Sequence, residues 1–275
     1  MFENYNYEDW KKQFYKETKG KSPEDLSYSP EGYAAIQIRP YYDRNTIPPF
    51  RNQKFSQTIN QGILFSGNWN IPVTKTLEEY NISVCYAPGD SNLVPPSPDR
   101  RWEIIEKSED TIKFTDNATA EFIDGNIPRN AFRKLTSIFG NSDLSPSELW
   151  IIPGSDIFFT IGLIRGIFKY IHHTNGHYTP KIRVYLQPGK SNDDLETSLL
   201  KYTNKVLASL ISGIDKIIWE WPTSELFSNN YYLFLNIAEI LTREGKVKEY
   251  GDVLEGADFF EDLSDKVSLH LSRSK

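Results

Sequence analysis

Cysteine and long apolar runs are nearly absent from this sequence of 275 residues. Cys85 is the only cysteine, which excludes a disulfide within the chain. The first residues do not have the pattern of a secretory signal peptide, in which a charged segment precedes an apolar one. The sequence therefore predicts a reducing, cytoplasmic location. The apolar stretch 157–171 is interrupted by Arg165 and Lys169, and it is shorter than the roughly 20 residues that cross a bilayer. We therefore expect no association with a membrane.

Charge of one sign is not concentrated anywhere in the chain. Asp and Glu number 37 against 31 Lys and Arg, which gives a net charge of −6 with no long run of either sign. Proteins that bind a phosphate backbone carry clustered Lys and Arg, so nucleic acid is not an expected partner. The chain is richer in apolar side chains, since 39% of its residues are hydrophobic. This content can bury a large core, and the length suits one α/β barrel of about 250 residues.

The N-terminal region predicts a helical arm followed by a strand. Trp10, Phe14 and Tyr15 recur at near-helical spacing, and Gly20 follows as a helix stop. A turn with a capping serine comes next, and the chain then alternates as a strand does. We assign residues 1–45 to this N-terminal arm and first strand.

Residues 46–149 have an irregular pattern. Pro, Asn and Ser are frequent in residues 42–99, which predicts loops around one strand at 82–86. One or two further strands are predicted within 102–114, and a short helix is predicted at 130–139.

Residues 150–275 have a much clearer pattern, in which short β-rich runs alternate with longer segments of helical periodicity. Such βα units form parallel sheets that are covered by their crossover helices. The sequence therefore predicts a TIM-barrel-like α/β fold over residues 46–275, with a barrel that is incomplete or remodelled. The predicted strands are 149–152, 181–186 and 216–221, and the predicted helices are 156–172, 192–212, 229–244 and 264–272.

Two acidic residues lie at the ends of predicted strands, where barrel enzymes place their catalytic groups. Glu220 stands between Trp219 and Trp221, and a carboxylate flanked by indoles can act as a general acid. Asp156 follows another strand and could act together with Glu220. Ordinary packing explains Glu220 more simply, and capping of the next helix explains Asp156. Both acids are kept as catalytic candidates, with the structural explanation preferred.

Two other motifs have a simple structural explanation. His173 and His177 are four residues apart, as in helical zinc pairs, but Asn175 and Gly176 interrupt that helix. An exposed helix end explains these histidines better, and we expect no metal site. Residues 188–191 are similar to the end of a phosphate-binding loop but lack its first glycine, so they predict a turn.

Several short segments resemble the methylmalonyl-CoA mutase family. The order Trp, Lys-Gly, Glu-Gly and Pro-x-Tyr near the N-terminus is similar to the start of mutase subunits. Further segments near the C-terminus follow in the order that the family has. The segments are 8–12, 19–21, 29–32, 40–42, 163–166, 201–208, 212–213 and 236–241.

The sequence also departs from the catalytic members of that family. Catalytic chains carry Gly-Gly-Thr-Gln-Ser-Leu-His-Thr, whose histidine contacts substrate and cofactor, and the corresponding residues here are 212–219. Ile218 stands at the position of the histidine, and the cobalamin signature Asp-x-His-x-x-Gly is missing. The resemblance thus implies a shortened, non-catalytic small subunit that binds no cofactor alone.

The resemblance implies a partner as well. The small subunit would dock to a large catalytic mutase subunit, which would hold adenosylcobalamin, unless the chain self-associates. N-terminal arms wrap the neighbouring chain in this family, so Trp10, Phe14, Tyr15 and Tyr41 are the expected contacts. Two alternatives stay open: residual acyl-CoA or cobalamin binding without turnover, and an independent barrel hydrolase or carbohydrate-binding module that uses Glu220.

Overall fold

The computed structural model describes residues 7–27, 29, 60–64, 82–88, 101–107, 110–114, 118–140, 146–174, 180–188, 193–222, 224–247, 249 and 251–273. The strand expected after the N-terminal helix, the expected contact residue Tyr41 and His177 lie outside these residues.

The described residues include eight strands that pair in the order of the sequence, and the first also pairs with the last, which closes a barrel. The hydrogen bonds between β3 and β4 and between β4 and β5 are antiparallel, and the other pairings are parallel. The strands are β1 (Asn60–Leu64), β2 (Ile82–Pro88), β3 (Arg101–Lys107), β4 (Thr111–Phe114), β5 (Thr119–Asp124), β6 (Glu148–Ile152), β7 (Lys181–Leu186) and β8 (Lys216–Glu220). The barrel-like α/β fold expected from the sequence is therefore confirmed.

β4 distinguishes this barrel from the all-parallel arrangement of a TIM barrel. Only residues 108–110 connect β3 to β4, and only 115–118 connect β4 to β5. A parallel crossover needs about a dozen residues, whereas a short turn returns the chain in the opposite direction. The segment predicted as one or two strands is thus a hairpin. The described residues between 60 and 140 hold five strands and a helix, which is more regular structure than the sequence predicted.

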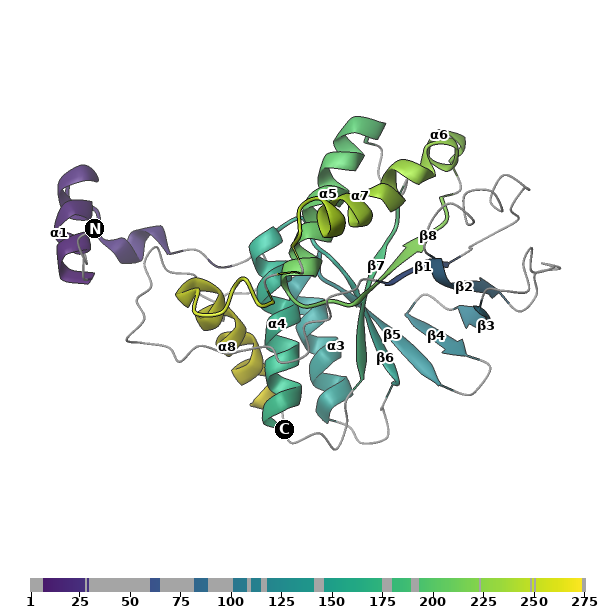
Figure 1. Cartoon of the computed structure of the whole chain (residues 1–275). Coiled ribbons are helices and arrows are strands. Elements are labelled where there is room, and N and C mark those ends of the chain that lie inside the picture. The colour runs from purple at the N-terminus through teal and green to yellow at the C-terminus, as the bar shows by residue number, and fades with distance from the viewer. Residues whose placement is uncertain are drawn as a thin grey trace.

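The described helices from α3 onward gather on one side of the barrel, around β5 to β8 (Figure 1). Most match the predicted segments to within a few residues. α8 begins six residues before the predicted position, because Phe259 and Phe260 at its start pack against Phe158 at the start of α4. The helices are α3 (Pro128–Gly140), α4 (Ile157–His173), α5 (Leu195–Ile211), α6 (Glu225–Asn229), α7 (Tyr231–Arg243) and α8 (Asp258–Ser272). None of these described helices combines the length and the apolar character that crossing a membrane requires.

The strands divide their side chains between two apolar cores, because successive residues of a strand point to opposite faces. One face packs against the helices; its buried residues include Ile63, Ile123, Leu149, Ile151, Ile182, Val184, Leu186, Ile217 and Trp219. The other face fills the barrel interior with Leu64, Ile105, Ile112, Ala120, Phe122, Trp150, Tyr185 and Ile218. The described side chains of this face thus form a packed core.

Three aromatic rings occupy the centre of that interior. The Trp150 ring lies 5.7 Å from both the Phe122 ring and the Tyr185 ring, and the last two are 4.9 Å apart. The indole Nε1 of Trp150 donates a hydrogen bond of 2.7 Å to Glu148, which satisfies the polar end of the buried ring.

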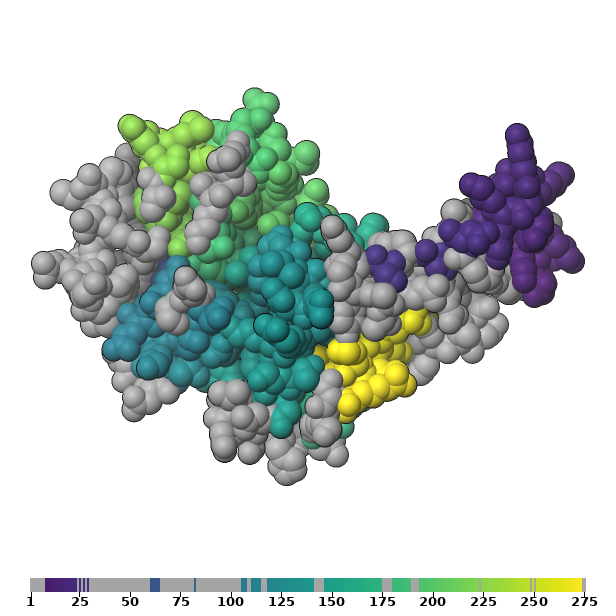
Figure 2. Space-filling view, turned by 180° about the vertical axis from the view of Figure 1, so that it is seen from behind, coloured from purple at the N-terminus to yellow at the C-terminus, as the bar shows by residue number. Residues whose placement is uncertain are grey.

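The N-terminal arm begins with α1 (Tyr7–Glu17), followed by the short 3₁₀ helix η1 (Pro23–Leu26). Gly20 ends the first helix with φ of +91°, a conformation that glycine adopts without strain, as its position predicted. Figure 1 and Figure 2 both show α1 standing away from the barrel. The predicted helix of the arm is confirmed, whereas the boundary between arm and barrel at residue 45 stays a prediction.

Candidate functional site at the carboxyl ends of the strands

A group of polar side chains meets where three barrel strands end. Lys107 is the last residue of β3, Glu220 is the last residue of β8, and Gln187 directly follows β7. Tyr185 lies two residues before Gln187 and therefore on the same face of its strand. The alternation places all four side chains on the inner face of the barrel. We call these four residues the carboxyl-end cluster.

Both carboxylate oxygens of Glu220 accept a short hydrogen bond. Lys107 Nζ lies 2.7 Å from Oε1, and Gln187 Nε2 donates to Oε2 at 2.7 Å. Lys107 Nζ also donates to the Tyr185 hydroxyl at 3.2 Å, and Gln187 Nε2 lies 3.4 Å from the same oxygen. The cluster therefore joins β3, β7 and β8 through one ion pair and its hydrogen bonds.

Burial determines the electrostatic character of the cluster. Glu220 is only 5% exposed, so Lys107 rather than water compensates its negative charge. Burial, and then the nearby Glu220 carboxylate, raise the pKa of the Tyr185 hydroxyl far above its ordinary value. Tyr185 consequently stays protonated at neutral pH and serves as a neutral hydrogen-bonding group.

A tyrosine from the helical layer supports the cluster from outside. The Tyr202 hydroxyl, on α5, donates a hydrogen bond of 2.5 Å to the backbone carbonyl of Gln187. Burial, followed by the charge of Glu220, raises the pKa of Tyr202, so this donor keeps its proton. Tyr202 thereby holds in place the residue whose side chain binds Glu220.

The structure corrects the expected surroundings of Glu220. Trp219 points to the opposite face of β8, into the helix-covered core, where its Nε1 donates to Gln61 Oε1 at 3.0 Å. The Trp221 ring packs against the Tyr231 ring at 4.4 Å, also in that core. Neighbouring residues of a strand cannot share a face, so the prediction that indoles flank the carboxylate is wrong. Among the described residues, Trp219 and Trp221 therefore pack in the helix-covered core and not beside the Glu220 carboxylate.

Asp156 caps a helix, as its simpler explanation predicted. Its side chain accepts a hydrogen bond of 3.0 Å from the backbone N–H of Phe159 and begins α4. The carboxylate therefore satisfies a free N–H group of its own helix.

Asp194 plays the same role for α5 and provides a test by pH. It accepts a hydrogen bond of 2.7 Å from the backbone N–H of Thr197, and this bond lowers the pKa of the carboxyl below its ordinary value of 3.8. A group with a lower pKa in the folded state stabilises that state at neutral pH, and the benefit disappears as the pH falls from about 4 through the folded pKa. We expect Asp194→Ala to lower the thermal midpoint at pH 7, and this effect to shrink as the pH falls below the ordinary carboxyl value of 3.8.

Asp194→Asn is the matched control for that experiment, because asparagine also caps helices well but carries no charge. At pH 7, Asp194→Asn should lower the thermal midpoint much less than Asp194→Ala does. An effect of Asp194→Ala that does not shrink as the pH is lowered from 7 to well below 3.8 would contradict the assignment of the charge.

The remaining candidates do not gather at the cluster. His172 and His173 are exposed in the last turn of α4, where their prediction placed them. Within the described ranges, no three His, Cys, Asp or Glu side chains come together as metal ligands.

Sequence reasoning found Glu220 but missed its partners. Lys107, Tyr185 and Gln187 belong to no functional motif, Tyr202 was noted only within the mutase-like segment 201–208, and Lys107 lies 113 residues before Glu220. A positional signal existed only for Gln187, which directly follows the predicted strand 181–186, whereas Lys107 lies inside the segment 102–114, where no strand end was predicted. A search for polar residues at predicted strand ends would therefore have found Gln187 but not Lys107.

Comparison with protein-family models gives no match, and comparison with curated proteins gives none either. The grounds for a functional proposal are therefore the side chains described above and the mutase-like segments of the sequence.

Proposed function

We propose that this chain is a non-catalytic barrel subunit of the methylmalonyl-CoA mutase type, which acts in the cytoplasm by docking to a large, cobalamin-dependent mutase subunit. The partner holds adenosylcobalamin and performs the chemistry. The N-terminal arm supplies the contacts to the partner through Trp10, Phe14 and Tyr15, together with Tyr41. The single observation that carries the proposal is the position of α1 apart from the barrel, since this helix bears an aromatic pair.

The first support comes from the barrel interior. Ile218, at the position of the mutase histidine, is completely buried and pairs with Tyr185 of β7 and with Gly62 of β1. An aliphatic side chain can neither accept nor donate a proton. At the carboxyl ends of the strands, both oxygens of Glu220 are already bound to Lys107 and Gln187. These contacts suit a group that braces the barrel.

The second support comes from α1. Trp10 and Phe14 lie four residues apart on one face of the helix, with ring centroids separated by 5.0 Å. Tyr15 is 48% exposed, and Trp10 and Phe14 are partly exposed. Exposed apolar surface costs about 25 cal/mol for each Å² relative to a buried state, so such an arm gains from covering by a partner. Aromatic anchors at helical spacing are typical of a helix that binds in a groove.

Removing the two rings tests the proposal. We expect Trp10→Ala with Phe14→Ala to weaken the complex with the cognate large subunit by at least about 30-fold, because central aromatic residues contribute most to an interface. Size-exclusion chromatography and calorimetric titration measure the affinity. Since α1 stands away from the barrel, the thermal midpoint of the isolated chain should stay unchanged.

Lys12→Ala is the matched control, because Lys12 is an exposed residue of the same helix and should leave binding intact. A wild-type chain that stays monomeric in the presence of the large subunit would contradict docking. Formation of rearranged thioester product by the purified chain with adenosylcobalamin and acyl-CoA would contradict the non-catalytic role.

A further inference from the structure

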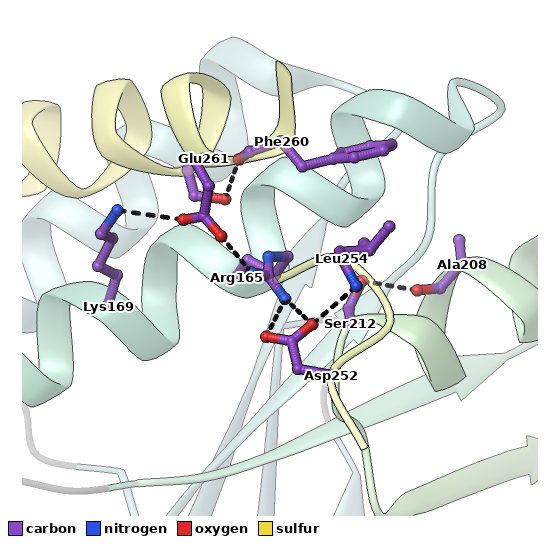
Figure 3. A network of polar contacts seen from close by, with 9 residues as sticks. Arg165, Lys169, Ala208, Ser212, Asp252, Leu254, Phe260 and Glu261 are labelled. Atoms are coloured by element: carbon purple, nitrogen blue, oxygen red, sulfur yellow. Dashed lines mark hydrogen bonds and ion pairs between the residues drawn. The ribbon is translucent and has the colours of Figure 1, made fainter. Parts of the chain in front are cut away.

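A buried network of charges joins three parts of the chain outside the barrel (Figure 3). Arg165 on α4 donates from Nη1 to both oxygens of Asp252, at 2.7 and 2.8 Å, and from Nη2 to Glu261 on α8 at 2.9 Å. Lys169, one turn further along α4, lies 3.6 Å from Glu261 and also pairs with Asp265. Two cations of one helix thus hold three acids of the C-terminal segment.

The centre of this network is closed to water. The side chains of Arg165 and Glu261 are 0% exposed, and that of Asp252 is 1% exposed. Buried ion pairs of this kind contribute little net stability compared with apolar side chains, yet the loss of one partner leaves an uncompensated buried charge. The position of the C-terminal segment therefore depends strongly on each of these charges.

The acids and the helix that they anchor form one structural unit. Asp252 also accepts a hydrogen bond of 3.0 Å from the backbone N–H of Leu254, which folds the turn before α8. Gly251 and Gly256 on either side of this turn have φ of +70° and +74°, and each has open space where a Cβ would stand. Glycines with such angles in open surroundings let the turn change shape at low cost.

The apolar contact between α4 and α8 is close because α4 presents glycines. A Cβ built on Gly162 would lie 2.3 Å from Leu263 Cγ, and one built on Gly166 would lie 2.4 Å from Val267 Cβ. Residues 162 and 166 of α4 thus form a flat strip that the side chains of α8 cover. α8 pairs with no strand, so the closed barrel does not require it for its hydrogen bonds.

We propose that residues 251–273 form a releasable cover over α4, with the Arg165 network as its latch. In the closed state the network holds α8 on the glycine strip. When one charge of the network is lost, its former partners are left buried without compensation. Opening exposes these partners to water, which lowers their free energy, so the segment opens as a unit while the barrel stays folded. Opening uncovers the strip around Gly162 and Gly166.

Hydrogen exchange measured by mass spectrometry on the full chain tests the latch. Asp252→Asn keeps the size of the side chain and removes one charge. We expect amide exchange in residues 258–272 to rise by on the order of tenfold to 100-fold, while exchange in β5 to β8 stays at the wild-type rate. Lys169→Met, at the more exposed edge of the network, should give a smaller rise in the same peptides. It also serves as the test if Asp252→Asn does not fold.

A triple variant separates a latch made of charges from simple packing. Arg165→Met with Asp252→Leu and Glu261→Leu replaces the central charges by apolar groups and should return exchange in residues 258–272 to the wild-type rate or below it. Arg243→Met, which removes an exposed ion pair from α7, is the control and should change nothing in these peptides. Equal acceleration in the barrel and in α8, or a triple variant as fast as Asp252→Asn, would overturn the proposal.

Discussion

Trp150→Ala is expected to lower the free energy of unfolding by about 3–5 kcal/mol, the range measured for large aromatic truncations in packed cores. Trp150 is completely buried at the centre of the barrel, where it contacts Phe122 and Tyr185. The surrounding strands belong to a closed sheet and cannot collapse into the space that the indole leaves. Glu148 would also lose the donor that binds its carboxylate.

Denaturant unfolding followed by circular dichroism measures this loss. Trp150→Phe is the control: it refills most of the space but still removes the hydrogen bond to Glu148, so its cost should be clearly smaller. Equal costs for the two variants would mean that the hydrogen bond, rather than the packed ring, stabilises the interior. A cost for Trp150→Ala below about 1 kcal/mol would contradict the packed interior.

Arg165→Met is also expected to lower the free energy of unfolding by about 3–5 kcal/mol, because it leaves Asp252 and Glu261 buried without their main cation. The side chains of Asp252 and Glu261 are almost completely buried, and of these two acids only Glu261 also lies near Lys169. Lys169→Met should cost less, since its second partner, Asp265, is 41% exposed and can turn to solvent.

The matched control is Arg243→Met. Arg243 is 74% exposed and pairs with Glu239 within its own helix, and exposed pairs contribute about 0–1 kcal/mol. Chemical unfolding of the three variants under one set of conditions gives the free energy of unfolding of each, by which they are ranked. A cost for Arg165→Met as small as that for Arg243→Met would show that water reaches the network.

The sequence was most informative where periodicity was strong. β7 has the predicted bounds of 181–186, and α4 and α5 differ from their predictions by a few residues at most. In these segments the apolar residues repeat with the period of the element that they form, so local information was sufficient. The helix caps were also local, since Asp156 and Asp194 bind N–H groups three residues later.

β1 shows where local information fails. It has five residues and begins with Asn, Gln and Gly, which are poor strand formers, and it lies in a segment that predicted loops. Its conformation follows from pairing with β2 on one side and with β8 on the other. The second partner is more than 150 residues away, so no window of sequence around β1 contains it.

The candidate site was predictable to the same limited degree. The end of a strand identified Glu220, but the choice of its neighbours depended on which other strand ends meet it across the barrel. Lys107 and Gln187 arrive from β3 and from the turn after β7. The indoles next to Glu220 in sequence lie on the opposite face of the sheet, so adjacency along the chain was misleading there.

The sequence by itself determined which side chains share a face, because the periods of a strand and of a helix are local properties of the backbone. It therefore determined that Tyr185 lies with Gln187 and that Arg165 lies with Lys169. Only the tertiary structure decided what those faces meet. Closure of the barrel joined Glu220 to Lys107, and the return of the C-terminal segment placed Asp252 and Glu261 on Arg165, 87 and 96 residues away. Such contacts depend on how the whole chain packs, which no local period specifies.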